Sequence, residues 1–461
     1  MARIKWVFAV FLCVCVLPVT TLARQSNPEK KLYAFVNVNV IPMDREQVLE
    51  NQVVLVKNGK ISQIGPANHV KIPKKAERIE AGGKFLLPGL IDAHAHLASD
   101  TNLPNDLARQ WLKLNLANGI TTIRNMVGNP SHLVLRDRIA RGEVLGPTLI
   151  TSGPPILGFM APNPAEGEQL VTEYKNAGFD LIKVHENLSP QTYDAIVATA
   201  RKLGIPVAGH VTQTVGLERA LNARQETIEH LDGYIRALLP ATVPVEVPPG
   251  QIILGPVLQY VETARIPALA QTTKTAGVYN TPTLALFKVI VSDEKPEDLL
   301  KWPELRYATP KMRSDFTKQK QSFLNNAIPL EDRLPFTQIR NQLVVGLSQN
   351  GAKLLAGSDS PQFFLVPGFA LHRELQALVD AGLTPFQALE AATRTPAEYL
   401  KLNKQIGTVE VGKRADLVLV EANPLTSIAN ASKTAGVMLK GQWISGAELQ
   451  RMLAEIAELN K

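Results

Sequence analysis

The chain has 461 residues, of which 45% are hydrophobic, and a formal net charge of +7, which together predict a globular protein with a large core. Its two cysteines, Cys13 and Cys15, lie in the N-terminal segment, so disulfides, thiolate catalysis and cysteine-ligated zinc are excluded from the rest of the chain. The charge is mild, and no basic block interleaved with aromatic residues indicates a nucleic-acid partner.

The N-terminus resembles a secretory signal. Arg3 and Lys5 precede an apolar run over residues 6–19, which is shorter than the about 20 residues that a membrane helix needs. We predict a signal peptide over residues 1–23, with Arg24 as the first mature residue. The mature protein is then secreted or periplasmic, with no stable membrane insertion after cleavage, and an uncleaved anchor is the alternative.

Residues 24–87 predict the N-terminal part of a small β domain. Short alternating runs indicate strands over 34–41, 52–57 and 60–64. Asn58-Gly59 separates the last two runs, and this dipeptide between apolar strands is typical of a tight hairpin.

Residues 88–403 predict a (β/α)₈ TIM barrel, an α/β fold, because short apolar strands alternate with helical stretches. Helices are expected, for example, over 106–118, 190–203 and 215–222. The eight expected strands cover residues 85–94, 120–126, 148–152, 179–184, 206–210, 226–230, 280–284 and 353–357. The active site of such a barrel lies at the carboxyl ends of its strands.

The last segment, residues 404–461, returns to strands, expected over 407–409, 416–420 and 437–439, with one more after Trp443. We expect it to pair with the N-terminal strands in a composite β-sandwich, because mutual pairing satisfies exposed strand edges. Within the barrel, the proline-rich residues 232–256 are interpreted as a lid or substrate wall, with an irregular loop as the alternative. Residues 286–345 are a charged helical insertion without a predicted role.

His94 and His96 end the apolar strand that begins at Phe85. Side chains two residues apart on a strand point the same way, so both imidazoles leave one face at its carboxyl end. Two neutral imidazoles that converge are typical of a divalent-metal site, although two hydrogen-bonded histidines would leave the same pattern.

Four more metal-capable groups end apolar strands: Lys183, His210, His230 and Asp359. Burying so many polar groups at one rim is costly unless they are paired or bind metal. The sequence therefore predicts that all six side chains meet at one site.

The chain resembles the amidohydrolase superfamily over nearly its whole mature length, most closely the Xaa-Pro dipeptidases and imidazolonepropionase-like hydrolases. The motifs that carry this resemblance are Pro88-Gly-Leu-Ile-Asp-Ala-His-Ala-His96, Gly119-Ile-Thr-Thr-Ile-Arg124, Leu145-Gly-Pro147, Lys183, His210, His230, Ala356-Gly-Ser-Asp359 and the segment from Gly407 to Val418. Two positions depart from related sequences, Asn125 and the segment 152–160, and both are expected near the substrate.

The resemblance implies a binuclear metal site. His94 and His96 would bind the more buried ion, and His210 and His230 the more exposed one. Lys183 would be carboxylated and bridge both ions, since an ammonium would repel them. Asp359 would bind the buried ion and act as general base and acid, activating a hydroxide that bridges the metals. Zinc is the expected metal, with manganese as the alternative.

Further histidines and one arginine have candidate roles. We expect His185 to contact substrate, or alternatively to orient a neighbouring site residue. We expect Arg124 to bind a substrate carboxylate, with a buried structural ion pair as the alternative. We expect no role in the site for three other histidines: His69 and His132 are predicted on the surface, and His372 is predicted to pack on a helix.

Together these observations predict a metal-dependent hydrolase of carbon–nitrogen bonds in dipeptides of the Xaa-Pro type, N-acyl amino acids or cyclic amides. A lactonase, carbamate hydrolase or phosphotriester hydrolase with the same site is one alternative, and a non-catalytic exported binding protein is another. The expected partner is a small-molecule or dipeptide substrate, and the sequence leaves a homo-oligomer open.

Overall fold

The structure is a computed structural model that describes residues 31–103, 105–245 and 252–461. The predicted signal peptide, residues 1–23, lies outside the described residues. Within them, no helix combines the length and the apolar character that a membrane crossing requires.

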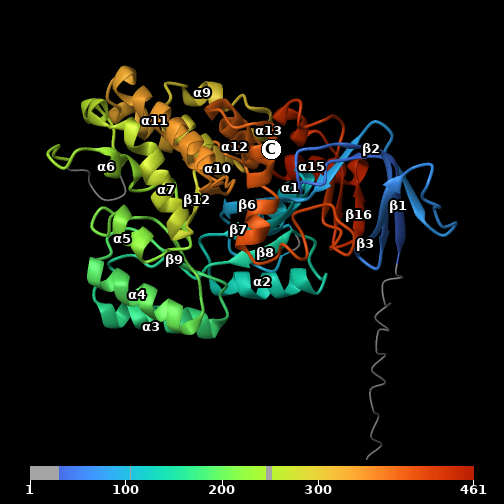
Figure 1. Cartoon of the computed structure of the whole chain (residues 1–461), viewed down its shortest axis with the longest axis horizontal. Coiled ribbons are helices and arrows are strands. Elements are labelled where there is room, and N and C mark those ends of the chain that lie inside the picture. Colours follow the sequence, from blue (N-terminus) through green and yellow to red (C-terminus); the bar gives the residue numbers. More distant parts are fainter. Residues whose placement is uncertain (1–30, 104, 246–251) are drawn as a thin grey trace, which may run out of the picture.

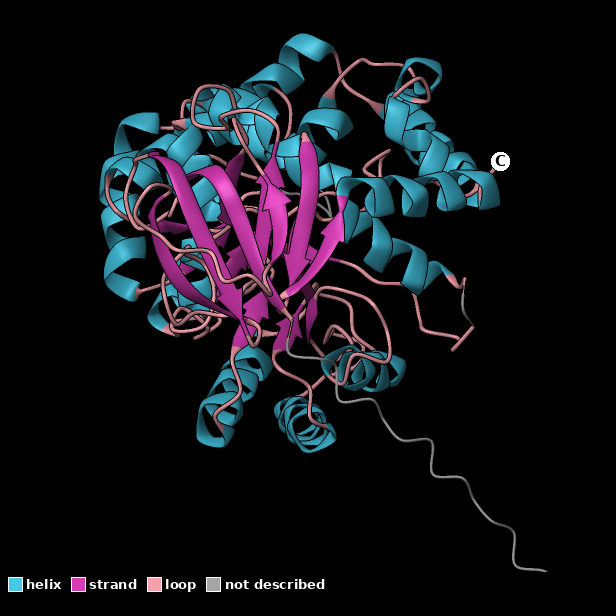
Figure 2. Cartoon of the chain, turned by 90° about the vertical axis from the view of Figure 1, so that its right-hand side faces the viewer, coloured by secondary structure: helices cyan, strands magenta, loops and turns pink. Residues whose placement is uncertain are grey.

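Strands from both ends of the described chain form one eight-stranded sheet, which we call the composite sheet. Its hydrogen-bonded order is β16-β15-β14-β5-β1-β2-β3, and β4 also pairs with β1. The strands are β1 (Leu32–Val40), β2 (Leu49–Lys57), β3 (Lys60–Pro66), β4 (Glu77–Glu80), β5 (Phe85–Pro88), β14 (Leu417–Val420), β15 (Thr434–Leu439) and β16 (Gln442–Ser445). The predicted pairing of the two ends is confirmed, and all eight strands belong to one hydrogen-bonded sheet (Figures 1 and 2). This sheet curls over itself, because the ring of Phe35 on β1 lies 5.3 Å from that of Trp443 on β16, four strands away in the order.

The predicted hairpin is present. Asn58 and Gly59 both have positive φ, 54° and 77°, as a tight two-residue turn between β2 and β3 requires. The predicted strand over 407–409 is wrong: this segment has no ladder, and Val409 instead donates one backbone hydrogen bond to the carbonyl of Pro42.

The eight strands predicted for the barrel are all found, mostly shorter than expected. They are β6 (Leu90–Ala95), β7 (Ile120–Asn125), β8 (Thr148–Thr151), β9 (Ile182–Val184), β10 (Val207–Gly209), β11 (Thr227–Glu229), β12 (Tyr279–Thr281) and β13 (Lys353–Leu354). All their ladders are parallel, in two sheets of order β6-β7-β8 and β13-β12-β11-β10-β9.

Backbone hydrogen bonds cross both seams between these two sheets. At one seam Ser152 forms a parallel bridge with Leu181. At the other, the amide of Asp359 donates to the carbonyl of His94 at 2.7 Å. The strand pairing is thus a mixed α/β arrangement of two parallel sheets, and it is not one continuously closed ladder.

The strand predicted over 85–94 is divided at Gly89. β5 belongs to the composite sheet and β6 to the parallel sheets. A Cβ at Gly89 would lie 2.2 Å from the Thr121 hydroxyl oxygen, so only glycine lets the chain pass this closely between the two sheets.

Fifteen α-helices lie among the described residues, and many flank the parallel strands (Figure 1). They are α1 (Leu107–Ala117), α2 (Pro130–Ala140), α3 (Pro164–Ala177), α4 (Pro190–Leu203), α5 (Leu217–Asn222), α6 (Tyr234–Leu238), α7 (Ile266–Ala276), α8 (Leu284–Val291), α9 (Pro296–Leu299), α10 (Pro310–Asn326), α11 (Leu330–Gln349), α12 (Phe369–Ala381), α13 (Pro385–Ala391), α14 (Arg394–Tyr399) and α15 (Gly446–Leu459). The insertion over 286–345 is helical, as predicted. α15 was not anticipated, although Ser445 and Glu448 form a capping box at its start.

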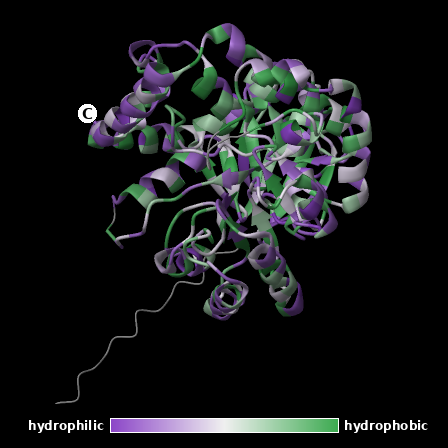
Figure 3. Cartoon of the chain, turned by 90° about the vertical axis from the view of Figure 1, so that its left-hand side faces the viewer, coloured by the Kyte–Doolittle hydropathy of each residue, from purple (hydrophilic) through white to green (hydrophobic). Residues whose placement is uncertain are grey.

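The main hydrophobic core fills the space between the parallel strands and their helices, and a second core lies under the composite sheet. Figure 3 shows hydrophobic residues on the central strands and many hydrophilic residues on the outer helices. Packing against these cores therefore holds the strands of the composite sheet and of the parallel sheets in place, and it fixes the positions of the strand ends.

Candidate metal centre

The structure brings all six predicted ligands together at the carboxyl ends of the parallel strands. His94 lies on β6 and Lys183 on β9. The other four follow strands directly or within a few residues: His96 after β6, His210 after β10, His230 after β11 and Asp359 after β13.

Asp359 is at the centre of this cluster. One of its oxygens, Oδ1, lies 2.6 Å from Nε2 of His96 and 3.3 Å from Nε2 of His94, and Oδ2 lies 3.7 Å from Nδ1 of His230. One ligand atom from each of His94, His96 and Asp359 lies within 4.8 Å of the others, close enough to share a metal ion.

The remaining predicted ligands extend the cluster. Nζ of Lys183 lies 3.4 Å from Nε2 of His94. The ring of His230 is 4.9 Å from that of His94 and 4.8 Å from that of His210, measured between centroids. Two groups of imidazoles, one around His94 and one formed by His210 and His230, therefore lie side by side.

The donor set of His94 fits a cation. Its Nδ1 lies 2.7 Å from Oε2 of Glu229, a buried carboxylate whose pKa is held well below its usual range, mainly by Arg124 against the opposing effect of burial. Burial lowers the pKa of His94 to about 4, so the ring carries its single proton on Nδ1. Its Nε2 lone pair then faces an oxygen of Asp359, and two facing acceptors are satisfied by a metal ion between them.

His210 has the same kind of partner. Its Nδ1 lies 2.7 Å from Oδ2 of Asp232. A carboxylate that accepts from one ring nitrogen orients the other for a metal, and this pairing is common at zinc sites.

Burial and neighbouring charge set the state of the two other central groups. Burial by itself would raise the pKa of Asp359, but the imidazoles of His94, His230 and His96 outweigh it and hold that pKa well below its usual value. Burial lowers the pKa of Lys183, which is 2% exposed. Asp359 is thus an ionised carboxylate, and Lys183 is closer than an ordinary lysine to a neutral amine.

Two of these residues have strained backbones. His230 and Asp359 have φ values of 61° and 52°, in the left-handed region that side chains other than glycine rarely adopt. Such strain persists only where surrounding contacts impose it, and it is frequent at functional sites.

Arg124 does not reach the substrate space. The side chain is fully buried, and it donates to Oε1 of Glu229 at 2.8 Å and to the hydroxyl of Tyr399 at 3.0 Å. The expectation that it binds a substrate carboxylate is corrected to a buried ion pair, which through Glu229 supports His94.

His185 lies beside the cluster, with its ring 4.2 Å from that of His210. Its Nδ1 accepts from the amide of Glu186, and burial lowers its pKa to about 3. Contact with substrate stays a prediction for this residue.

His132 was expected on the surface, but it is fully buried. Its Nδ1 accepts from Nδ2 of Asn125 at 2.9 Å, and Oδ1 of Asn125 accepts from the amide of Leu97. Asn125 therefore holds loops together beneath the site instead of lining the substrate space, because its amide is taken up by these bonds.

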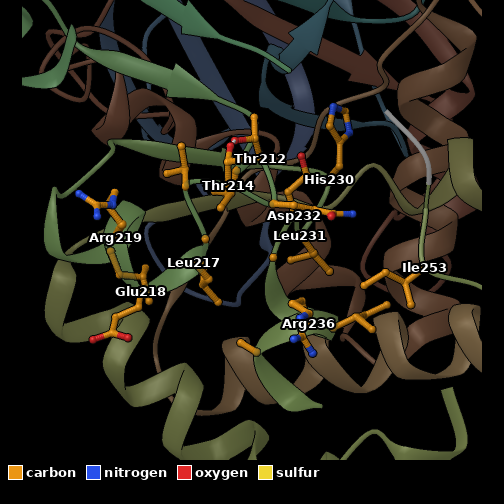
Figure 4. Close-up of a pocket in the computed structure, with 18 of the residues that line it drawn as sticks. Thr212, Thr214, Leu217, Glu218, Arg219, His230, Leu231, Asp232, Arg236 and Ile253 are labelled. Carbon is orange, nitrogen blue, oxygen red and sulfur yellow. Dashed lines mark hydrogen bonds between the residues drawn. The ribbon is translucent and has the colours of Figure 1, made fainter. Parts of the chain in front are cut away.

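A cavity of about 1280 Å³ opens beside the cluster (Figure 4). His230, Asp232, Thr212 and Thr214 lie near one another in its lining. An apolar wall near His230, which we call the apolar wall, consists of Leu231, Ile235, Ile252, Ile253, Phe287 and Phe336. Part of the proline-rich segment thus lines the cavity, while residues 246–251 lie outside the described residues.

Sequence reasoning missed the carboxylates Glu229 and Asp232. A signal for Glu229 was present, because a charged residue in an otherwise apolar strand needs a buried partner. Alternation along the strand would have placed Glu229 and His230 on opposite faces. The left-handed conformation of His230 breaks that alternation, so both side chains reach the site.

Comparison with known proteins gives a consistent picture. The model of the amidohydrolase family matches residues 85–444. An imidazolonepropionase from Brucella anthropi is 21% identical over 413 residues, which cover 85% of this chain and 93% of that protein.

Two solved structures show the same fold. One is the bottromycin amidohydrolase, with a TM-score of 0.70 and 24% identity, covering 93% of this chain and 90% of that one. Another is an Xaa-Pro dipeptidase with bound methionine, with a TM-score of 0.64 and 20% identity, covering 90% of this chain and 100% of that one.

Proposed function

The chain belongs to the amidohydrolase family and is a hydrolase of carbon–nitrogen bonds, and from this premise we propose that it cleaves an amide bond of a small substrate with two divalent metal ions. The observation that carries the proposal is the carboxylate of Asp359 surrounded by metal-capable side chains, namely His94, His96, His230 and Lys183. The non-catalytic alternative does not fit this membership.

The residues present fit a metal pair. His94 and His96 with Asp359 would hold one ion, and His210 with His230 would hold the other. Lys183, as a carbamate, would supply an oxygen to each. When bound, two such ions lower the pKa of a shared water to about 7 and polarise the scissile carbonyl. Zinc suits imidazole and carboxylate ligands, and manganese is the alternative.

Asp359 is the proposed general base and acid. As an ionised carboxylate among imidazoles, it accepts a proton from the attacking water and passes it to the leaving nitrogen, which departs poorly as an anion. His94 is held in one tautomer by Glu229, so its Nε2 lone pair is left for a metal ion.

We propose an apolar group on the substrate, next to the scissile bond. The apolar wall lies beside His230, and the cavity exceeds the about 300 to 1,000 Å³ of common ligand pockets. Dipeptides, N-acyl amino acids and cyclic amides with apolar side chains fit this lining. A panel of these, with lactone, carbamate and phosphotriester members, tests the chemistry: turnover of the esters alone would contradict amide hydrolysis.

Architecture and compartment complete the proposal. We propose that β6–β13 form a (β/α)₈ barrel, supported by the backbone hydrogen bonds at both seams.

We also propose export to the periplasm or the medium, on the basis of the sequence of residues 1–23. Fractionation of cells that express the full chain, with sequencing of the mature N-terminus, tests this proposal.

We expect the mature protein to bind about two divalent ions per chain. Reconstitution with zinc or manganese followed by elemental analysis measures this. The double variant His210→Ala, His230→Ala should retain about one ion, because only the half-site around His94 remains. His372→Ala is the matched control, since this buried histidine contacts the carbonyl of Asn118 outside the cluster. One ion in the wild type, unchanged in the double variant, would contradict the second half-site.

The apolar wall gives a separate prediction. Replacing Ile252 and Ile253 with alanine should raise KM for apolar amides by about tenfold or more with little change in kcat, because each removed methylene weakens binding in an apolar pocket. Val411→Ala, an exposed position, is the control. Steady-state kinetics on apolar and small polar amides of one series test this prediction. An equal change in KM for both kinds of amide would show that the apolar wall does not bind the substrate.

A further inference from the structure

Arg340, on α11 of the helical insertion, is a buried cation that contacts the backbone of the metal centre and also lines the cavity beside it. It is 3% exposed, and its Nη1 and Nη2 donate to the backbone carbonyls of His230 and Pro282. The two carbonyls belong to the segments that follow β11 and β12. One guanidinium thus ties together the two chain segments that carry and support His230.

These segments have an unfavourable backbone conformation. His230, Leu231 and Thr283 have φ values of 61°, 54° and 50°, and a β-branched residue such as threonine is especially rare there. A conformation of this kind persists only where surrounding contacts over-determine it. The two hydrogen bonds from Arg340 are contacts of that kind, because they hold the carbonyls next to the strained residues.

The tautomer of His230 is set next to the carbonyl that Arg340 binds. The hydroxyl of Thr283 donates to the carbonyl of Pro282 at 2.8 Å, the same carbonyl that Arg340 binds. With its hydrogen committed, that hydroxyl accepts from Nδ1 of His230, also at 2.8 Å. Nδ1 therefore carries the proton, and the Nε2 lone pair is left for a metal ion.

The guanidinium itself is fixed by aromatic packing. Its central carbon lies 4.1 Å from the ring centroid of Phe287 and 5.2 Å from that of Phe336. The planar fork is thereby held in the orientation in which two donors reach two carbonyls, which the ammonium of a lysine cannot match.

We propose that Arg340 is a positioning residue for the half-site of His210 and His230, which gives the helical insertion its role. The inference rests on the proposed binuclear function. It concerns the affinity of the protein for metal, so it can be measured without a substrate.

The experiment compares two buried arginines of one helix. Arg340→Met should weaken the binding of one zinc ion by about 10- to 100-fold, the range for groups that orient metal ligands. Arg333→Met is the matched control, because Arg333 is also 3% exposed and donates to the carbonyls of Val291 and Ile328. It should lower stability without changing zinc affinity. Competition of the metal-free full-length proteins with a chromogenic chelator gives both dissociation constants.

Two further variants keep the test decisive if Arg340→Met folds poorly. Arg340→Lys should recover part of the lost affinity. Thr283→Val keeps the branched shape and removes the hydroxyl, so it should weaken the same zinc ion. The double variant Arg340→Lys, Thr283→Val should lose less than the two single losses combined, because both act through one carbonyl.

The outcomes separate this inference from the proposed function. A wild type that binds fewer than two ions contradicts the binuclear function. A wild type with two ions, and equal zinc affinities in Arg340→Met and Arg333→Met, overturns only the role of Arg340. Full metal binding in Arg340→Met with KM raised solely for substrates that carry a carboxylate would also overturn it, and would make Arg340 a substrate-binding residue.

Discussion

Replacing Lys183 with alanine is expected to remove bound metal and activity together. Nζ of Lys183 lies 3.4 Å from Nε2 of His94, and the side chain is buried among the other proposed ligands. A protonated amine there would repel two cations. Burial lowers its pKa, which favours the neutral amine that can attack CO₂. An N–C bond then forms, one proton is released, and the resulting carbamate is an anion with two oxygens.

Chemical rescue makes this prediction specific. Formate or acetate should restore part of both metal content and activity in Lys183→Ala, by occupying the place of the carbamate. Removal of CO₂ during reconstitution of the wild type should slow metal uptake, and bicarbonate should restore it. Lys320→Met is the control: Lys320 is also fully buried but donates to the carbonyls of Val289 and Ser292. Full activity in Lys183→Ala, or equal rescue of both variants, would refute the carbamate.

Asp359→Asn is expected to lower kcat by roughly 10² to 10⁴, the range for loss of a general acid–base group. Asparagine keeps the size and one oxygen ligand, but it cannot accept the proton of the attacking water. Metal content, measured on the same sample, should fall much less than kcat. This difference separates proton transfer from metal binding.

Asp416→Asn provides the comparison for Asp359. Asp416 is equally buried, but it accepts from the amide of Lys440 and pairs with Arg414 beside the composite sheet. We expect lower stability and an unchanged kcat in that variant. Near-normal kcat in Asp359→Asn with both metals present would assign the proton transfer to another group.

The sequence by itself predicted the strand positions and the candidate ligands. Apolar runs of four to eight residues mark buried strands, and parallel strands place their carboxyl ends at one rim, so His94, Lys183 and Asp359 could be expected to meet. The hairpin at Asn58-Gly59 was equally local, because the turn depends only on the conformations that these two residues allow. The pairing of the two chain ends followed from the need to satisfy strand edges.

Only the tertiary structure decided the partners of these groups. Arg124 lies near the carboxyl end of its strand, where a substrate-binding arginine would be expected. Instead it forms a buried ion pair with Glu229, 105 positions further along the chain. His230 and Asp359 reach the site through left-handed backbones that strand periodicity does not predict. Arg340 reaches His230 from a helix whose sequence carries no motif. Periodicity specifies which face a residue occupies within its own strand, whereas burial of a charge depends on groups distant in sequence, and those meet only when the fold is complete.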